Sequence, residues 1–187
     1  MTGKTIEELA PGDHAELTRT VGQEDIEHFV DAVGDYNPVH SDPAYAASTP
    51  FKEPIAPGIF TAGLISAVIG TELPGPGAIY LSQSLKFLKP VRLGDRITAH
   101  VEILEVLRER NRIRLATVCR NQHGEDVLSG EAWVMPSKSH VVYDGRAAQP
   151  SAAGLWAFQP WALATHALSV WGLLGLAMLT GSLTRRR

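Results

Sequence analysis

Asp35 and His40 are the residues of this 187-residue chain whose types and spacing best suit acid–base chemistry. They stand five positions apart, with Asn37 and Pro38 between them. A carboxylate and an imidazole on one stiff loop can hold a water molecule, so that one group removes a proton and the other donates one. Pro38 restricts Asn37 to extended backbone and stiffens the loop. The spacing equally fits a structural interpretation, in which Asp35 stabilises a turn and His40 is simply hydrogen-bonded.

Gly58 is the second candidate, because it stands at the start of an apolar stretch expected to be helical. The first N–H groups of a helix lack partners and lie at its positive end. A substrate carbonyl held there would be stabilised as negative charge develops on its oxygen. Ser66 follows eight residues later, on roughly the same helix face, and could support the site. A tight turn at Gly58 and simple packing of Ser66 are the structural alternatives.

Two helices and a long loop must position these residues. The stretch 57–70 is apolar nearly all round and about 14 residues long, which predicts a buried helix too short to span a membrane. Apolar residues at Ile26, Phe29, Val30 and Val33 predict an earlier helix with one buried face. Between the two helices, residues 34–56 are rich in Gly, Asp, Asn and Pro, which predicts a long loop of functional type with a short helical turn near 43–47.

The rest of the chain body alternates between apolar and polar residues. Alternation over 79–87, then near 97–103, 112–121 and 126–135, predicts consecutive antiparallel strands, and 14–21 is expected to be an opening strand. The sequence therefore predicts an α+β domain in which a curved sheet wraps a central helix.

Composition excludes several classes of protein. Cys119 is the single cysteine, so neither an internal disulfide nor a multi-cysteine zinc site is expected. The histidines have no metal-ligand spacing, and no phosphate-binding glycine motif occurs, so we expect no metal and no cofactor. Residues 1–137 hold 19 of the 20 Asp and Glu but only 12 of the 17 Lys and Arg, and this acidic balance argues against a nucleic-acid partner.

The last fifty residues differ from this body. We expect a domain over 1–137, a linker over 138–153 and an apolar tail over 154–187. The tail has no charged side chain before its three terminal arginines, and its 23-residue stretch 161–183 is long enough for a membrane-associated helix. A packed extension, or a tail with no function of its own, is the alternative. Residues 1–10 show no secretory signal, so the body is expected to be cytoplasmic, with membrane contact only through the tail.

Two stretches of the body resemble the MaoC-like R-specific enoyl-CoA hydratases. They are GDYNPVHSDP at 34–43, followed by PIAPGI at 54–59, and IYLSQSLKF at 79–87, followed by PV at 90–91 and GD at 94–95. The resemblance runs through about residues 10–136, and the tail takes no part in it. It implies a hot-dog fold, usually as a homodimer with joined sheets.

The resemblance also implies an activity, namely the reversible syn addition of water to a trans-2-enoyl-CoA. By position, Asp35 and His40 would hold and activate the water, and the Gly58 N–H would bind the thioester carbonyl. Asn37 and Ser66 would support the site, and no cofactor would be needed because the CoA thioester is itself the substrate. The family often has His-Gly where this chain has Pro57-Gly58, so any second N–H donor at position 57 is lost.

Other functions remain compatible with the same residues. An acyl-thioesterase or an acyl-carrier dehydratase could use this fold, although paired acid–base groups on one loop favour hydration over hydrolysis. A non-catalytic module targeted to a membrane by its tail is the third alternative. Acyl chain length, the choice between CoA and acyl-carrier protein, the pathway, and the formal acid and base of the pair stay open.

Overall fold

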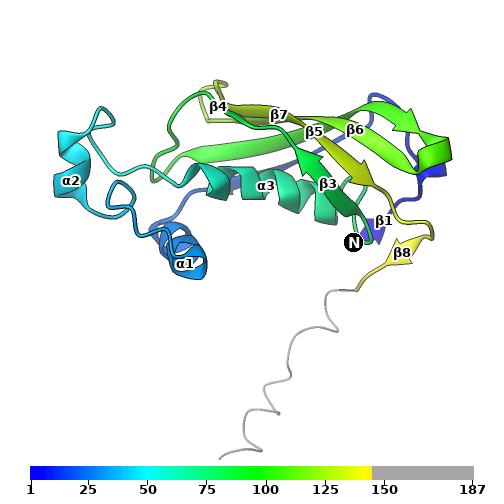
Figure 1. Cartoon of the computed structure of the whole chain (residues 1–187), viewed down its shortest axis with the longest axis horizontal. Helices are drawn as coiled ribbons and strands as arrows, with labels where there is room; N and C mark the ends of the chain where they lie inside the picture. Colours follow the sequence, from blue (N-terminus) through cyan, green and yellow to red (C-terminus); the bar gives the residue numbers. More distant parts are fainter. Residues whose placement is uncertain (145–187) are drawn as a thin grey trace, which may run out of the picture. The chain divides into compact units, whose positions relative to one another are not determined.

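An antiparallel sheet of six strands curves around one side of a long helix (Figure 1). The computed structural model describes residues 1–144, which form one compact unit. The strand order is β2-β5-β6-β7-β3, and the short β4 also pairs with β7. The strands are β2 (His14–Thr20), β3 (Ile79–Gln83), β4 (Lys86–Phe87), β5 (Arg96–Leu107), β6 (Arg112–Arg120) and β7 (Asp126–Met135). The predicted α+β class, with a sheet wrapped on a helix, is confirmed.

The helices lie close to the predicted positions. Each is bounded by a residue that favours the start or the end of a helix. Helix α1 (Gln23–Val33) ends at Gly34, whose φ of 75° lies in the left-handed region that glycine adopts without strain. Helix α2 (Pro43–Ser48) begins after Asp42, whose carboxylate accepts the first free backbone N–H groups. Helix α3 (Gly58–Thr71) begins after Pro57, and it runs beneath the sheet in Figure 1.

The core lies between α3 and the inner face of the sheet. Strands β5 and β6 alternate between buried and less buried residues, as expected for strands with one face on a core. On α3, Leu64, Ile65, Val68 and Ile69 face this layer and are buried. Burying each such side chain stabilises the fold by roughly 1.5–3 kcal/mol, before the entropy cost of ordering it.

One face of α3 is open to solvent, and here the prediction of a helix buried all round is wrong. Ile59 is 57% exposed, and Gly63, Ser66 and Gly70 are exposed on the same side of the helix. The reason is geometric, because a single sheet layer covers only one side of a helix. Residues three, four and seven apart share the other side.

The predicted strand over 79–87 is divided in two. A register shift lies between Tyr80 and Ser82, and the chain leaves the ladder between Gln83 and Lys86 before β4 pairs with β7. The carbonyl of Ser84 lies so close to Gly130 that a side chain there would have its Cβ 1.8 Å from the oxygen. Gly130 thus permits the close backbone crossing that separates β3 from β4.

Two short strands join the ends of the described chain. Strand β1 (Thr2–Gly3) pairs with β8 (Val141–Val142), which lies within the stretch expected to be a linker. That part of the stretch therefore packs on the folded unit, because its backbone N–H and C=O groups find partners there. The expected tail, 154–187, lies outside the described residues and stays a prediction. Within residues 1–144, the helices are too short or too polar to cross a membrane.

Candidate active site

Asp35 and His40 come together at the end of α1. The Asp35 N–H donates to the carbonyl of Val30 at 3.2 Å, so this residue continues directly from the helix end. A tight turn follows, in which the His40 N–H donates to the carbonyl of Asn37 at 3.0 Å. The turn folds the chain back and leaves His40 Nε2 3.7 Å from Asp35 Oδ2. The sequence interval of five residues thus becomes a side-chain pair.

The two members of this pair have different surroundings. The His40 side chain is 9% exposed, whereas that of Asp35 is 46% exposed. Nδ1 of His40 lies 2.8 Å from the carbonyl oxygen of Ile55. Because a carbonyl can only accept, Nδ1 carries the hydrogen, and the neutral ring then presents the lone pair of Nε2 toward Asp35. In the neutral form of the ring, the pair therefore offers two proton acceptors, Nε2 on a buried side chain and the carboxylate on a side chain open to solvent.

Asn37 stabilises the loop that carries His40. Its Oδ1 accepts from the N–H of Val39 at 3.3 Å, which closes a local turn before His40. The neighbouring Val39 is buried, and its carbonyl accepts from the Ile55 N–H at 3.2 Å. These contacts tie both ends of the loop to each other, so the imidazole is held by the fold as well as by its own hydrogen bond.

A ring contact ties the two helices that border the site. Phe29 of α1 meets Phe60 of α3 edge to face, with ring centroids 6.0 Å apart. Such pairs contribute about 0.5–1.5 kcal/mol beyond the area they bury. Since α1 leads into Asp35 and α3 begins at Gly58, this contact helps to fix the distance between the two candidate groups.

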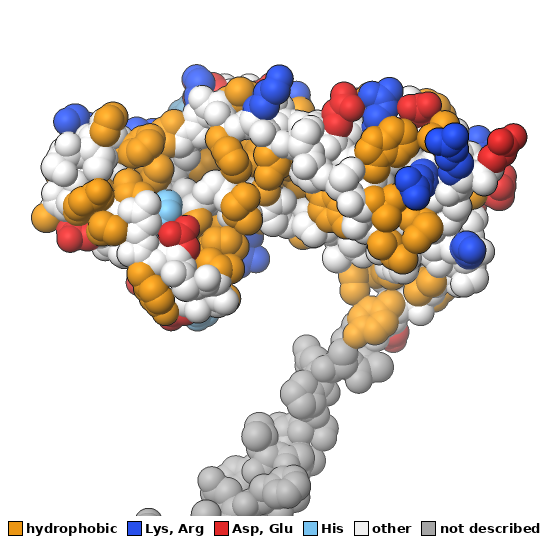
Figure 2. All heavy atoms as spheres, in the orientation of Figure 1, with side chains coloured by type: hydrophobic (Ala, Val, Ile, Leu, Met, Phe, Trp, Pro, Cys, Tyr) orange, Lys and Arg blue, Asp and Glu red, His pale blue; other side chains and the backbone are white. Residues whose placement is uncertain are grey.

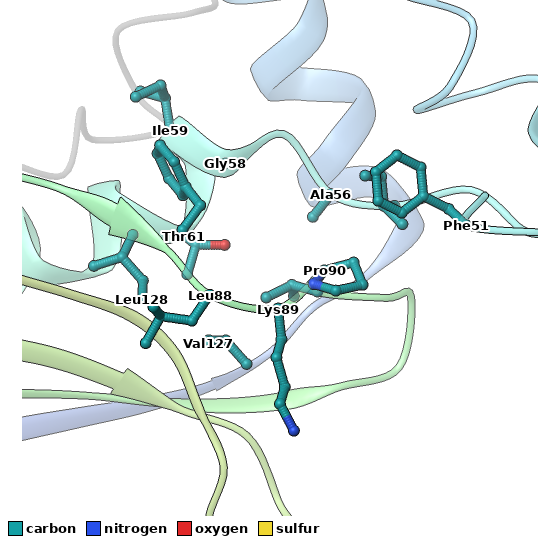
Figure 3. A pocket seen from close by; sticks show the side chains of 13 residues that line it. Phe51, Ala56, Gly58, Ile59, Thr61, Leu88, Lys89, Pro90, Val127 and Leu128 are labelled. Atoms are coloured by element: carbon teal, nitrogen blue, oxygen red, sulfur yellow. The ribbon is translucent and has the colours of Figure 1, made fainter. Parts of the chain in front are cut away.

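Gly58 lines a cavity of about 470 Å³. Its walls come from the first turn of α3, from the loop before it, and from β4, β7 and the segment that follows β4 (Figure 3). The labelled residues surround this space, and most of them are apolar, whereas the Lys89 side chain points away from it. The lining residues are Phe51, Ile55, Ala56, Gly58, Ile59, Thr61, Phe87, Leu88, Lys89, Pro90, Val91, Val127 and Leu128.

Asp35 and His40 are not among the residues that line this cavity, and His40 adjoins it through one contact. The link is Ile55, whose carbonyl holds the His40 ring and which itself lines the cavity. Figure 2 shows apolar side chains gathered on the surface over the part of the molecule that holds α1 and α2. The arrangement combines a polar pair at one side with an apolar chamber next to it.

A neutral group stands behind the cavity wall. The buried thiol of Cys119 lies 3.7 Å from the carbonyl of Thr61, a cavity residue. Burial raises the pKa of this thiol to about 12. The thiol keeps its proton near neutral pH, so it offers neither a nucleophile nor a negative charge to the chamber. Lys89, at the rim, forms an ion pair with Glu125.

Ser66 does not join the other candidates. It lies about 12 Å along the helix from Gly58, given a rise of 1.5 Å per residue. It is exposed on the open face of α3, and its hydroxyl forms no hydrogen bond with another residue of the 1–144 unit.

Sequence reasoning missed Phe87 and Ile55, to which it gave no role. The high apolar content of the stretch 79–88 is the one sequence feature that could have indicated a role for Phe87. No local pattern predicts that the Ile55 carbonyl accepts a hydrogen bond from His40.

Comparisons with known proteins place this geometry in context. A model of the MaoC like domain matches residues 8–123, a range that contains Asp35, His40 and Gly58. The 3-hydroxybutyryl-CoA dehydratase of Methylorubrum extorquens is 48% identical over 137 residues, which cover 73% of this chain and 87% of that protein. The (R)-specific enoyl-CoA hydratase of Rhodospirillum rubrum is 46% identical over 130 residues, covering 70% of this chain and 90% of that one.

Solved structures agree in fold. The unliganded R-hydratase PhaJ1 from Pseudomonas aeruginosa aligns with a TM-score of 0.73 and 45% identity, over 76% of this chain and 92% of the other. The (R)-hydratase from Aeromonas caviae involved in PHA biosynthesis aligns with a TM-score of 0.67 and 40% identity, over 68% and 97% of the two chains.

Proposed function

Because this chain belongs to the MaoC-like domain family, we propose that it is an R-specific enoyl-CoA hydratase. It adds water reversibly to a trans-2-enoyl-CoA and gives the (R)-3-hydroxyacyl-CoA. The single observation that carries the proposal is the approach of His40 Nε2 to Asp35 Oδ2, 3.7 Å apart beside a cavity that Gly58 lines. The names of the similar proteins agree with it in reaction and in substrate class.

Asp35 and His40 act on the water as a pair. With Nδ1 of His40 engaged by the Ile55 carbonyl, both Nε2 and the ionised carboxylate are acceptors. A water beside them donates one hydrogen to each and turns its lone pairs toward the substrate. As the oxygen attacks the β-carbon, the pair takes one proton from the water, and it returns one proton to the α-carbon on the same face. Atoms and charge balance, and the addition is syn.

The Gly58 N–H binds the carbonyl oxygen of the thioester. As the new C–O bond forms, the double-bond electrons move toward the carbonyl oxygen, which becomes enolate-like. An N–H at the start of α3 stabilises that charge, since it lies at the positive end of the helix. The thioester supplies the electron sink, so the proposed reaction needs no cofactor. The cavity beside Gly58 takes the acyl chain, whose transfer from water to an apolar wall contributes about 0.8 kcal/mol per methylene.

The reaction runs in both directions. Dehydration of 3-hydroxybutyryl-CoA is the reverse of hydration of crotonyl-CoA, so the hydratase and dehydratase names of the two relatives describe one equilibrium. The product class suits two uses, the supply of monomers for a polyester and the oxidation of fatty acids. An acyl-thioesterase on the same fold is the second candidate, and it would release free CoA instead of consuming the double bond.

The test measures the loss of enoyl-thioester absorbance with crotonyl-CoA and full-length protein. We expect turnover in the unmodified chain and a fall of about 10²- to 10⁴-fold in kcat/KM for Asp35→Asn and for His40→Gln. Asp31→Asn, an exposed aspartate on α1, is the matched control and should keep full activity. Release of a free thiol without loss of absorbance would instead identify a thioesterase, and equal activity in all variants would refute the assigned pair.

We further propose that the chain forms a homodimer. Two neighbouring features support it, the open face of α3 and the free edge of β3, where Ile79, Tyr80 and Leu81 are exposed. An exposed apolar edge strand is a template for pairing with another strand. A dimer that joins two β3 edges in one sheet would cover both features. Light scattering coupled to gel filtration should give twice the chain mass, and Leu81→Lys should shift it toward a monomer; a monomeric parent would overturn this proposal.

A further inference from the structure

The Phe87 ring lies against the residue proposed to bind the thioester. A Cβ built on Gly58 would come within 2.7 Å of Phe87 Cε1, with two more ring carbons at 3.0 and 3.2 Å. Non-bonded carbon atoms pack at about 3.5–4.0 Å, so the ring occupies the space that any side chain at position 58 would need. The absence of a side chain at Gly58 therefore makes room for a particular ring as well as for a ligand.

Tertiary structure fixes this ring in place from the strand side. Phe87 lies in β4 and pairs with Leu128 of β7, and both residues line the cavity. The side chain nevertheless stays 54% exposed, because only one side of the ring packs on α3. A half-exposed phenyl group on a cavity wall offers apolar area that a ligand can cover.

We propose that Phe87 is a specificity-determining residue that positions the enoyl group against the Gly58 amide. The inference rests on the proposed function, and it names the part of the substrate that the ring contacts. When the thioester carbonyl meets the Gly58 N–H, the conjugated double bond is the next part of the substrate along the chain. The ring beside Gly58 then packs on the α- and β-carbons and holds them toward Asp35 and His40.

This role makes a short acyl chain depend on Phe87 more than a long one does. A four-carbon enoyl group gains its apolar contacts close to the carbonyl, where the ring lies. A longer chain also contacts deeper residues such as Val127 and Leu128, and these contacts remain when the ring is removed. Misplacing reacting atoms by an ångström costs on the order of 100-fold in rate. Loss of the ring should therefore shift the preference toward longer substrates.

The first experiment compares trans-2-butenoyl-CoA with trans-2-octenoyl-CoA in Phe87→Ala. We expect kcat/KM to fall about 30-fold for the four-carbon substrate and less than threefold for the eight-carbon one. Leu93→Ala is the matched control, since Leu93 is also half exposed but is not among the residues that line the cavity. It should change the ratio of the two values by less than threefold. A loss of folded protein lowers both values equally and leaves the ratio unchanged.

A second experiment tests the contact itself. Gly58→Ala keeps the backbone N–H but drives a methyl group into the ring, so we expect a large loss of activity on both substrates. In the double variant Gly58→Ala/Phe87→Ala the methyl group has room, and activity on octenoyl-CoA should recover at least fivefold relative to Gly58→Ala. Recovery supports the inference, whereas a double variant no better than Gly58→Ala overturns it.

The two proposals fail in distinguishable ways. If the unmodified chain hydrates both substrates and Phe87→Ala leaves their ratio unchanged, the role of Phe87 is refuted while the hydratase stands. If the unmodified chain hydrates neither substrate, both the proposed function and the role of Phe87 are refuted.

Discussion

The loop over 34–57 and the layer of α3 with β5, β6 and β7 are held in place by different forces. In the layer, inward side chains such as Ile65, Val68 and Leu115 are wholly buried and apolar. In the loop, few side chains are buried, and position is fixed mainly by hydrogen bonds to the backbone, as at His40 and Asp42. In a close-packed layer, removing side-chain volume leaves a cavity that destabilises the fold. In a loop held by hydrogen bonds, removing a single donor or acceptor atom releases the segment that it holds. Substitutions in the two regions should therefore affect different properties, stability in one and catalysis in the other.

The largest expected effect on stability lies in the layer, at Ile65. Ile65→Ala removes fully buried carbon atoms from the centre of α3, and such changes cost about 2–5 kcal/mol of unfolding free energy. Urea unfolding should measure this loss, while activity per folded molecule stays within twofold. Val33→Ala, an exposed apolar residue at the end of α1, should cost less than about 0.5 kcal/mol. A large fall in the activity of folded Ile65→Ala would break the distinction between the two regions.

A smaller effect on stability, joined to an effect on activity, is expected in the loop at Asp42. Its Oδ1 accepts from the N–H groups of Ala44 and Tyr45, at 2.8 and 3.1 Å, and so caps α2 just after His40. Asp42→Ala should cost about 1 kcal/mol of stability and lower kcat/KM several-fold, as the loop that carries the imidazole loosens. Asp42→Asn can still accept both hydrogen bonds and should keep most of the activity. Equal activity in the two variants would show that the loop does not need this cap.

The smallest expected effect lies outside both regions, at the start of α1. A hydrogen bond from Arg19, with a further one from the Gly22 N–H, lowers the pKa of Asp25. The folded state therefore favours the ionised carboxylate. The resulting stabilisation is complete above the ordinary aspartate pKa of about 4, and it is lost as the pH falls through the lower folded value.

The difference in unfolding free energy between the unmodified chain and Asp25→Asn should accordingly stay below about 1 kcal/mol at pH 7 and shrink below pH 4. Chemical unfolding at several pH values measures it, with Glu24→Gln as the neighbouring control. A difference that grows in acid would contradict the assigned sign.

Sequence reasoning succeeded where a local pattern decides the structure. The apolar spacing from Ile26 to Val33 predicted α1, and Ile26 and Val30 of its predicted face are buried, whereas Val33 at its end is exposed. It was wrong about the open face of α3, because composition tells how apolar a helix is but not how many layers cover it. It also joined β3 and β4 into one strand, since the close approach of Ser84 to Gly130 involves residues far apart in the chain.

For the candidate site, the sequence predicted which residues could react but not how their side chains are positioned. Types and spacing made Asp35 and His40 candidates, and the family resemblance implied their catalytic role. The turn at Asn37 follows from local backbone preferences. The hydrogen bond from His40 to Ile55, which fixes the tautomer of the ring, and the contact of Phe87 with Gly58 join separate segments. No local rule reports such a contact.

The sequence by itself thus determined most of the elements, the candidate reacting groups and the family, because hydrophobic period, turn residues and motif spacing act over a few positions. Only the tertiary structure decided which side of α3 is covered, where the cavity lies and which ring stands beside Gly58. Those outcomes depend on how the sheet curves over the helix, and that curvature is the joint result of packing among residues scattered along the whole described chain.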